Sequence, residues 1–239
     1  MPLPKISTPS YELELPSTGE TVNYRPFLVK EEKLLLLALE SEDVKQVTTA
    51  VKNVIKNCVL SKGVKVETLP TFDIEYLFLN IRAKSVSEEV EVSLICPDDN
   101  ETTVTTTIQV DEIKVKKNEN HKKTINVDDE IMMEMKYPSL NEFIKNNFDI
   151  KDQNNLDQSF DLIISCIDKI FTKEEVWTSS DVTKKELMDF LEQMNSSQFK
   201  QIETFFETMP KLSHTVKIKN PNTEVESEVV LEGLSSFFA

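Results

Sequence analysis

The sequence predicts an α+β protein, with a helical core, an N-terminal β-hairpin and two further antiparallel hairpins that project from it. Alternating polar and apolar residues, which are typical of half-buried strands, open the chain and recur near its middle and its end. Stretches with apolar residues at helical spacing lie between them. Strand-like and helix-like stretches come in separate runs, so we expect no doubly wound parallel sheet.

Composition divides the chain into three segments. Residues 1–84 carry the N-terminal hairpin and helices, and residues 85–138 form a β insertion rich in Val, Thr and Glu. Residues 139–239 are mainly helical and end in a C-terminal β-hairpin. We expect the helices of residues 28–82 and of residues 139–209 to share one core.

A leucine-rich helix follows the N-terminal hairpin. Residues 11–15 and 21–25 alternate as two strands around a turn at Gly19, and Pro26 ends the second strand. Residues 30–39 contain only strong helix formers, including four consecutive leucines. Because this helix is apolar on all sides, we expect it to be buried on several sides and to be the hub of the fold.

The remaining elements are predicted from periodicity and capping. Helices are expected over residues 43–58, 72–82 and 156–171, and a capping box at Thr183 and Glu186 opens another. Ser196 or Ser197 is expected to cap the last helix. Residues 114–123 are polar and predict a mobile loop.

Two hairpins repeat the same local pattern. A strand leads to Cys96-Pro97 in one and to Asn220-Pro221 in the other, and a polar turn and a returning strand follow. The shape resembles a zinc-ribbon knuckle, in which a Cys-Pro-x-Cys turn binds the metal. Only Cys96 provides a thiol, with Asp98 or Asp99 in place of its partner. We therefore expect both knuckles to be metal-free and held by strand pairing alone.

Charge and composition exclude several classes of protein. The 239 residues carry a formal net charge of −15, from 42 acidic and 27 basic residues, which argues against nucleic acid as a partner. No apolar run has the roughly 20 residues of a membrane span, and the N-terminus has no apolar signal core. Three widely spaced cysteines predict buried, reduced thiols. We expect a cytosolic protein with no membrane and no small-molecule substrate.

The case for an enzyme is weak. The two histidines, His121 and His214, have no nucleophile motif beside them. The acidic pair at residues 98–99 and the acidic run at residues 128–130 lack the pattern of a calcium loop. Only three glycines occur, so there is no glycine-rich phosphate loop. We expect no catalytic residue, no cofactor and no metal.

Three stretches of the chain resemble one family in the same order. These are residues 11–39, residues 69–78, and the ending Leu231-Glu232-Gly233-Leu234 with Phe237-Phe238. They resemble the baseplate proteins of T-even-like contractile-tailed phages, and more narrowly the baseplate hub subunit or hub assembly catalyst. The resemblance implies a protein that binds other phage baseplate hub proteins in the host cell cytoplasm during assembly. It implies either a chaperone that leaves or a structural subunit retained in the virion tail baseplate, and it carries no catalytic residues.

Aromatic and apolar residues beyond the needs of a small core are the candidate partner contacts. Exposed members of such a set would form an interaction patch. Core packing is the alternative for most of them, and the last two phenylalanines dock either on the protein's own helices or on the partner. The candidates are Phe72, Tyr76, Phe78, Leu234, Phe237 and Phe238.

Overall fold

The computed structural model describes residues 6–41, 44–139 and 155–237. It confirms the α+β class, because the fold combines helices with small antiparallel sheets. Contacts group the chain into two compact units: Met1–Lys116 with Lys211–Ala239, called the terminal unit here, and Lys117–Pro210, called the central unit. These units are defined by contacts, whereas the three segments above were defined by composition, and that division stays a prediction.

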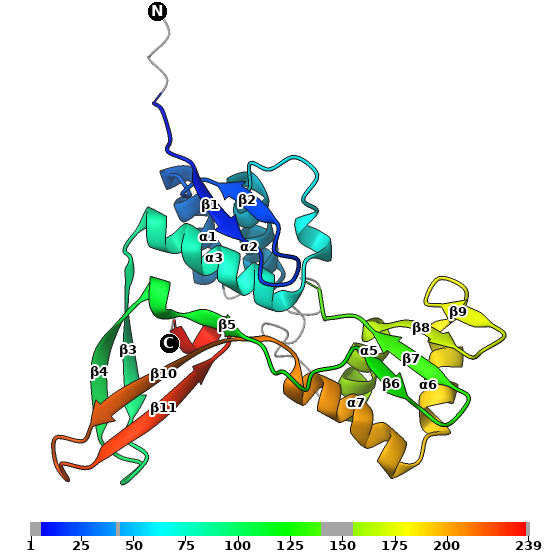
Figure 1. The fold of residues 1–239 in the computed structure, drawn as a ribbon. Helices are drawn as coiled ribbons and strands as arrows, with labels where there is room; N and C mark the ends of the chain where they lie inside the picture. Colours follow the sequence, from blue (N-terminus) through cyan, green and yellow to red (C-terminus); the bar gives the residue numbers. More distant parts are fainter. Residues whose placement is uncertain (1–5, 42–43, 140–154, 238–239) are drawn as a thin grey trace, which may run out of the picture. The chain divides into compact units, whose positions relative to one another are not determined.

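Figure 1 labels the helices and strands, which are numbered in the order of the chain. The terminal unit contains β1 (Tyr11–Glu14), β2 (Thr21–Tyr24), α1 (Val29–Glu40), α2 (Val44–Cys58), η1 (Val66–Thr68), α3 (Thr71–Ser85), β3 (Glu89–Ile95), β4 (Thr103–Gln109), η2 (Val110–Glu112), β5 (Lys114–Lys116), β10 (Lys211–Lys219), β11 (Glu226–Glu232) and η3 (Leu234–Phe237). The central unit contains β6 (Thr124–Asn126), β7 (Met132–Met135), α5 (Asn155–Cys166), β8 (Ile167–Phe171), β9 (Val176–Thr178), α6 (Lys184–Glu192) and α7 (Ser196–Thr208).

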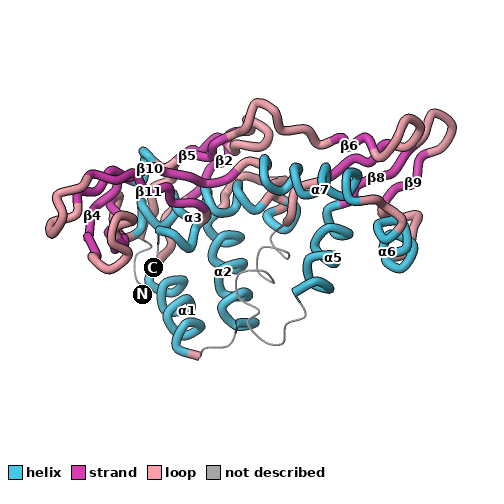
Figure 2. Tube along the Cα trace, turned by 90° about the horizontal axis from the view of Figure 1, so that it is seen from below, coloured by secondary structure: helices cyan, strands magenta, loops and turns pink. Residues whose placement is uncertain are grey.

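Helix α3 is the centre of the terminal unit. It contacts α2, β5, β10, η2 and η3 (Figures 1 and 2). Its buried residues point in several directions around the helix axis, as expected of a helix that packs on more than one side. They are Thr71, Phe72, Asp73, Ile74, Leu77, Leu79, Ile81 and Ala83.

The expectation that the leucine helix is the hub is wrong. Leu34, Leu36 and Leu37 of α1 are 45%, 55% and 55% exposed. Among the side chains of α1 that the structure describes, only Glu31 and Ala38 are buried. The strong helix formers did predict the helix, but helix propensity does not decide which side meets the core.

Helix α1 is instead fastened at its first turn by a buried ion pair. An Arg25 guanidinium nitrogen lies 2.9 Å from Glu31 Oε1, and the backbone N–H of Leu28 donates to Glu31 Oε2 at 2.8 Å. The burial of Glu31 opposes its charge, but the hydrogen bonds from Arg25 and Leu28 outweigh it, so the pKa of Glu31 is lowered. The ion pair with Arg25 and the hydrogen bond from Leu28 therefore hold the start of α1 in place, where we expected burial of its leucines to do so.

The two predicted hairpins are present, and they pack against each other. Strands β3 and β4 pair from Glu89↔Gln109 to Ile95↔Thr103, and β10 and β11 pair from Ser213↔Glu232 to Lys219↔Glu226. Their inward-facing residues join α3 and Phe237 in one apolar cluster. Residues 114–116, expected in a loop, form strand β5 on the other edge of β10. The segment is polar because its lysines face outward, while Val115 packs on the cluster.

The central unit packs three helices around a four-stranded antiparallel sheet of order β6-β7-β8-β9. The predicted helix over residues 156–171 is wrong at its end, because α5 stops at Cys166 and β8 follows. Ile167 and Ile170 lie three residues apart, which is a helical spacing, but pairing with β7 and β9 selects the strand. A register shift between Glu134 and Met135 of β7 lets both isoleucines pair with that strand. The capping box at Thr183 is confirmed, whereas Asn195 and not a serine caps α7.

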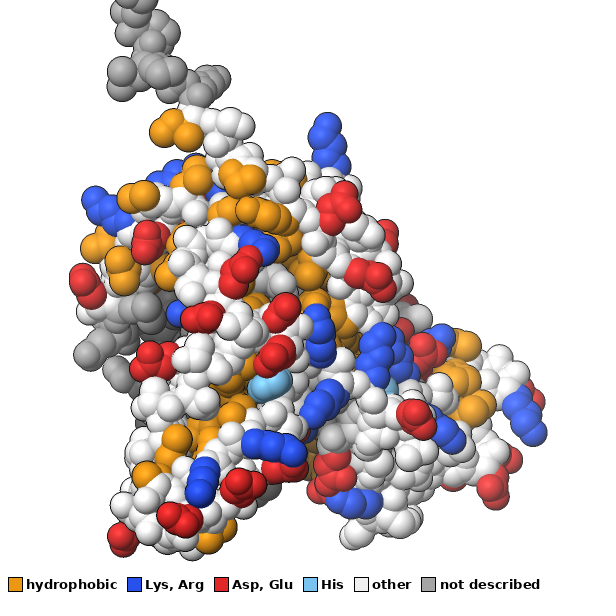
Figure 3. Space-filling view, turned by 60° about the vertical axis from the view of Figure 1, so that its left-hand side comes forward, with side chains coloured by type: hydrophobic (Ala, Val, Ile, Leu, Met, Phe, Trp, Pro, Cys, Tyr) orange, Lys and Arg blue, Asp and Glu red, His pale blue; other side chains and the backbone are white. Residues whose placement is uncertain are grey.

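Among the described residues, each unit has a buried apolar cluster of its own. That the helices of residues 28–82 and of residues 139–209 share one core stays a prediction. Among the described residues, no helix is long and apolar enough to span a bilayer. On the face drawn in Figure 3, acidic and basic side chains are interspersed, and hydrophobic side chains are exposed among them.

Candidate partner-binding and hairpin-tip sites

The structure separates the six predicted partner contacts. Phe72 and Phe237 are buried, at 2% and 0% exposure, while Tyr76, Phe78 and Leu234 are half-buried. Phe238 lies outside the described residues. A role in partner binding stays a prediction for all six.

Phe237 docks inside the terminal unit, which is the first of the two alternatives considered for the chain end. Gly233 turns the chain with φ of +73°, a conformation that favours glycine, and its N–H donates to the carbonyl of Leu212 at 2.9 Å. The short helix η3 then places Phe237 in the cluster formed by α3 and the two hairpins.

Glu75 of α3 lies under this C-terminal segment. Its carboxylate accepts a hydrogen bond from the backbone N–H of Leu234. Burial raises the pKa of Glu75 to about 7, and the hydrogen bond from Leu234 offsets this only in part. Near neutral pH, a large part of the population therefore carries a neutral carboxyl group at this contact.

The tips of the two hairpins are joined by side-chain hydrogen bonds. Asn220 is 1% exposed, and its amide nitrogen lies 3.1 and 3.0 Å from the two carboxylate oxygens of Asp98. The same nitrogen lies 2.8 Å from Asp99 Oδ2. The Asn220 carbonyl oxygen accepts from the N–H of Asn222 at 2.8 Å, so both ends of the amide have partners.

Hydroxyl groups complete the contact between the tips. Thr223 Oγ1 donates to Asp98, and Asn222 Nδ2 lies 2.9 Å from Thr102 Oγ1. Hydrogen bonds from Thr223 and Asn220 lower the pKa of Asp98, and those from Thr102, the backbone and Asn220 lower the pKa of Asp99. Both carboxylates therefore stay ionised at neutral pH. We expected strand pairing alone to hold the two hairpins. The structure differs, because this network of side-chain hydrogen bonds between the tips adds to the strand pairing.

The knuckle-like turns place Cys96, Asp99, Asn220 and Thr223 at the positions where a zinc ribbon carries its ligands. Cys96 is 1% exposed, and burial together with the charges of Asp98 and Asp99 raises the pKa of its thiol. Metal binding needs the thiolate, which this environment disfavours. Within residues 6–41, 44–139 and 155–237, no three His, Cys, Asp or Glu side chains come together as a metal site requires.

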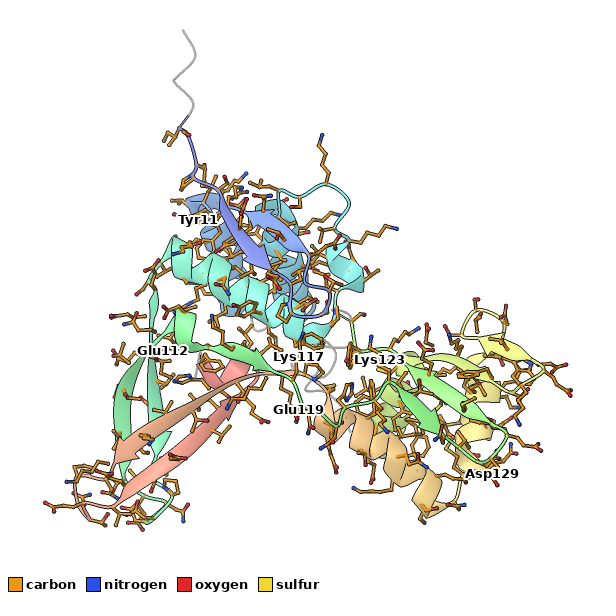
Figure 4. The ribbon with its side chains drawn as sticks, viewed as in Figure 1. Tyr11, Glu112, Lys117, Glu119, Lys123 and Asp129 are labelled. Atoms are coloured by element: carbon orange, nitrogen blue, oxygen red, sulfur yellow. The ribbon has the colours of Figure 1, made fainter. Side chains whose placement is uncertain are left out.

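The two histidines contact other side chains of the fold, and the two other cysteines are buried. His121 Nδ1 lies 2.9 Å from Thr208 Oγ1, and its ring packs on Tyr137 and Phe205. His214 Nε2 lies 3.9 Å from Glu112, which ends η2 (Figure 4). Cys58 and Cys166 are buried, as expected.

Sequence reasoning found the tip residues only as turns. It did not predict that Asn220 and Thr223 reach Asp98 across 122 and 125 residues. The signal that could have found them is the repeat itself, because Cys96-Pro97 and Asn220-Pro221 open two turns of the same pattern.

Comparison with known proteins gives one match. The family model described as "T4 bacteriophage base plate protein" matches residues 8–239, and the chain therefore belongs to this family. Neither the curated proteins nor the solved structures that were searched contain a match.

Proposed function

Because the chain belongs to a family of phage baseplate proteins, we propose that it acts in assembly of the baseplate hub, by binding another hub protein and without catalysing a reaction. The observation that carries this proposal is the family match over residues 8–239, which includes both units. A protein of a tail baseplate works among other baseplate proteins, so a protein partner is the expected ligand.

The chemistry of the described residues supports binding over catalysis. The three thiols are buried, and the ring of His121 packs between aromatic side chains. The acidic residues of the hairpin tips are already occupied by hydrogen bonds within the protein. Burial raises the pKa of the Cys58 thiol to about 11 although an Arg25 nitrogen lies 3.8 Å from its sulfur, so the thiolate nucleophile is disfavoured there.

The charge fits a factor that works in the host cytoplasm before the particle is complete. A net charge of −15 keeps free copies apart through mutual repulsion, and it attracts partners of opposite charge. A structural subunit retained in the virion is the second candidate, and it needs the same binding surface.

Two measurements on the phage that encodes this chain test the proposal. Deleting the gene should stop assembly before complete hubs form, and supplying the protein in trans should restore it. Complete baseplates made without the gene would defeat the proposal. Mass spectrometry of purified particles then separates the two candidates, because an assembly factor is absent from them and a structural subunit is present.

A further inference from the structure

Strand β4 pairs with β3 by every second residue. The N–H of Cys96 donates to the carbonyl of Thr102 at 2.7 Å, and the N–H of Val110 donates to the carbonyl of Glu88 at 2.9 Å. The register between these two bonds has no bulge. Because bonded pairs alternate along an antiparallel ladder, the even-numbered residues of β4 bond to β3. The odd-numbered residues therefore direct their N–H and C=O groups away from β3.

These outward groups of β4 are available to another strand. Within the part of the chain that the structure describes, β4 pairs with β3 alone, and its outward N–H and C=O groups have no partner (Figure 1). The side chains of Thr103, Thr105 and Thr107 are exposed on one face, and Val104 is half-buried at the border of the apolar cluster on the other. A strand added here gains a row of backbone hydrogen bonds and covers Val104.

The other edge strands are protected against such pairing. Proteins protect an exposed edge by keeping it short or by placing charged residues, proline or a bulge in it. Among the described strands, β1 and β2 have four residues each, and β5, β6 and β9 have three. The longer edges β3 and β11 carry glutamates. Strand β4 has seven residues and contains no charged residue, no proline and no bulge.

The charge around β4 selects the kind of strand. Residues 85–113 contain eight acidic residues and no lysine or arginine, so they carry −8 of the formal net charge of −15. Two of these acidic residues, Glu101 and Asp111, lie just before and just after β4. A second copy of this chain would bring the same charges and would be repelled, whereas a strand with lysine or arginine at its ends is attracted. The eight residues are Glu88, Glu89, Glu91, Asp98, Asp99, Glu101, Asp111 and Glu112.

We propose that the free edge of β4 receives an extended segment of another baseplate protein, with uncharged residues in its middle and lysine or arginine at its ends. The segment pairs with the outward N–H and C=O groups of Thr103, Thr105 and Thr107, and its apolar side chains cover Val104. This inference rests on the proposed function, and it names the surface that binds the partner and the form that the partner takes.

Strand β11 is the matched control edge. The N–H of Asn220 donates to the carbonyl of Val225 at 2.9 Å, so by the same alternation Val230 directs its N–H away from β10. The side chain of Val230 is 56% exposed. Lysines of β10 offset the glutamates of β11, as Lys217 does at 3.4 Å from Glu228. A basic strand is therefore not attracted to this edge.

A photo-crosslinking residue at position 107, in protein made during infection by the phage that encodes this chain, tests the inference. The control carries the same residue at position 230. We expect position 107, and not position 230, to capture a baseplate protein through an uncharged segment that has lysine or arginine at its ends. Capture of a second copy of this chain, of nucleic acid or of lipid, or equal products from both positions, would overturn the inference.

The variant Thr105→Pro gives the second measurement. Proline removes an outward N–H and keeps every bond between β4 and β3, and edge strands accept it at such positions. We expect roughly a tenfold loss of crosslinked product from position 107 and of baseplate rescue. Val230→Pro makes the same change on β11 and should leave both unchanged. Circular dichroism should show both variants folded, with a Tm close to that of the parent.

A charge variant gives a third measurement that does not alter the backbone. Glu101→Gln with Asp111→Asn should lower the yield of crosslinked product, because it removes the charges at both ends of β4. Glu174→Gln with Glu175→Gln removes two exposed acidic residues of the central unit and should not. If the deletion stops assembly and the folded Thr105→Pro and Glu101→Gln, Asp111→Asn proteins restore it fully, β4 is not the binding surface and the proposed function still stands. If the deletion has no effect, the proposed function itself fails.

Discussion

The side-chain amide of Asn220 donates to both carboxylate oxygens of Asp98, at 3.1 and 3.0 Å, across 122 residues of chain. This contact joins the ends of two hairpins whose strands already share an apolar cluster. Hydrogen bonds to charged acceptors are stronger than those between neutral groups, and a buried amide without partners is costly. The pair Asp98–Asn220 therefore connects the C-terminal hairpin to the middle of the chain.

Removing the Asn220 amide should destabilise the terminal unit. Asn220→Ala loses all three bonds to Asp98 and Asp99 and both bonds that its carbonyl accepts. We expect a fall in Tm of a few degrees, on the order of that for a loss of 1–3 kcal/mol in a chain of this size. Asn222→Ala, on the same turn but exposed, is the control and should cost much less. Equal Tm values for the two variants would show that the Asp98–Asn220 contact adds little.

The acid sensitivity of the protein should depend in part on Asp98. Its pKa lies below the ordinary value of 3.8 in the folded protein, so the stability it contributes is present above that value and is lost as the pH falls through the folded pKa. Asp98→Asn should therefore flatten the fall of Tm between pH 5 and pH 2 relative to the parent. The control is Asp129→Asn, on the turn between β6 and β7 (Figure 4), which should follow the parent curve. Parallel curves for all three proteins would contradict the assignment.

Glu75 should have the opposite pH dependence. Its folded pKa of about 7 lies above the ordinary value of 4.5, so its contribution favours folding at low pH and is lost as the pH rises from about 4.5 to 7. Glu75→Gln should raise the stability at pH 8, by at most about 3 kcal/mol, and should change it little at pH 4.5. Chemical denaturation at the two pH values measures this, and Glu228→Gln, whose side chain on β11 is 63% exposed, is the control. A variant that is less stable than the parent at pH 8 would refute this reading of Glu75.

Removing one partner of the Arg25–Glu31 ion pair should cost more stability than replacing both partners by apolar residues. Its side chains are 13% and 3% exposed, so Arg25→Met leaves a buried carboxylate without its main partner. We expect a loss of roughly 3–5 kcal/mol for this single change and a smaller loss for the double change Arg25→Met, Glu31→Met. Urea denaturation of the four proteins in the double-mutant cycle gives the coupling. Additive losses would mean that the pair does not hold α1.

Truncating Phe237 should test how the chain end is docked. Because its side chain is 0% exposed within the apolar cluster, Phe237→Ala should cost about 3–5 kcal/mol. The control, Leu234→Ala, changes a half-buried residue of the same short helix and should cost less. If Phe237→Ala kept the parent stability but failed to support hub assembly, the residue would belong to the partner interface instead.

Elemental analysis of the purified protein should find no stoichiometric zinc. The tip positions present one thiol, and its neighbouring carboxylates already accept hydrogen bonds from Asn220, Thr102 and Thr223. Zinc near one equivalent that survives dialysis against a mild chelator would show that the knuckle-like turns are metal sites.

Much of the architecture was determined by the sequence alone. The alternation in the hairpins, the helical spacing of α2, α6 and α7, and the capping box at Thr183 are local signals, and each is present in the structure. The order of motifs also indicated a phage baseplate protein, in agreement with the family match. These features depend on neighbouring residues, whose preferences act wherever the segment lies.

Only the tertiary structure decided which helix is central, where α5 gives way to β8, and which residues meet at the hairpin tips. The leucines of α1 and the apolar residues of α3 both predict a helix, but the packing of β10 and η3 on α3 decides which helix is buried. Residues 167–171 carry isoleucines at helical spacing, and only their pairing with β7 and β9 makes them a strand. Asn220 is a turn residue by its sequence, and it becomes a buried donor because Asp98, far away in the chain, lies within hydrogen-bonding distance. Each of these outcomes depends on a partner distant in sequence, which local propensity does not contain.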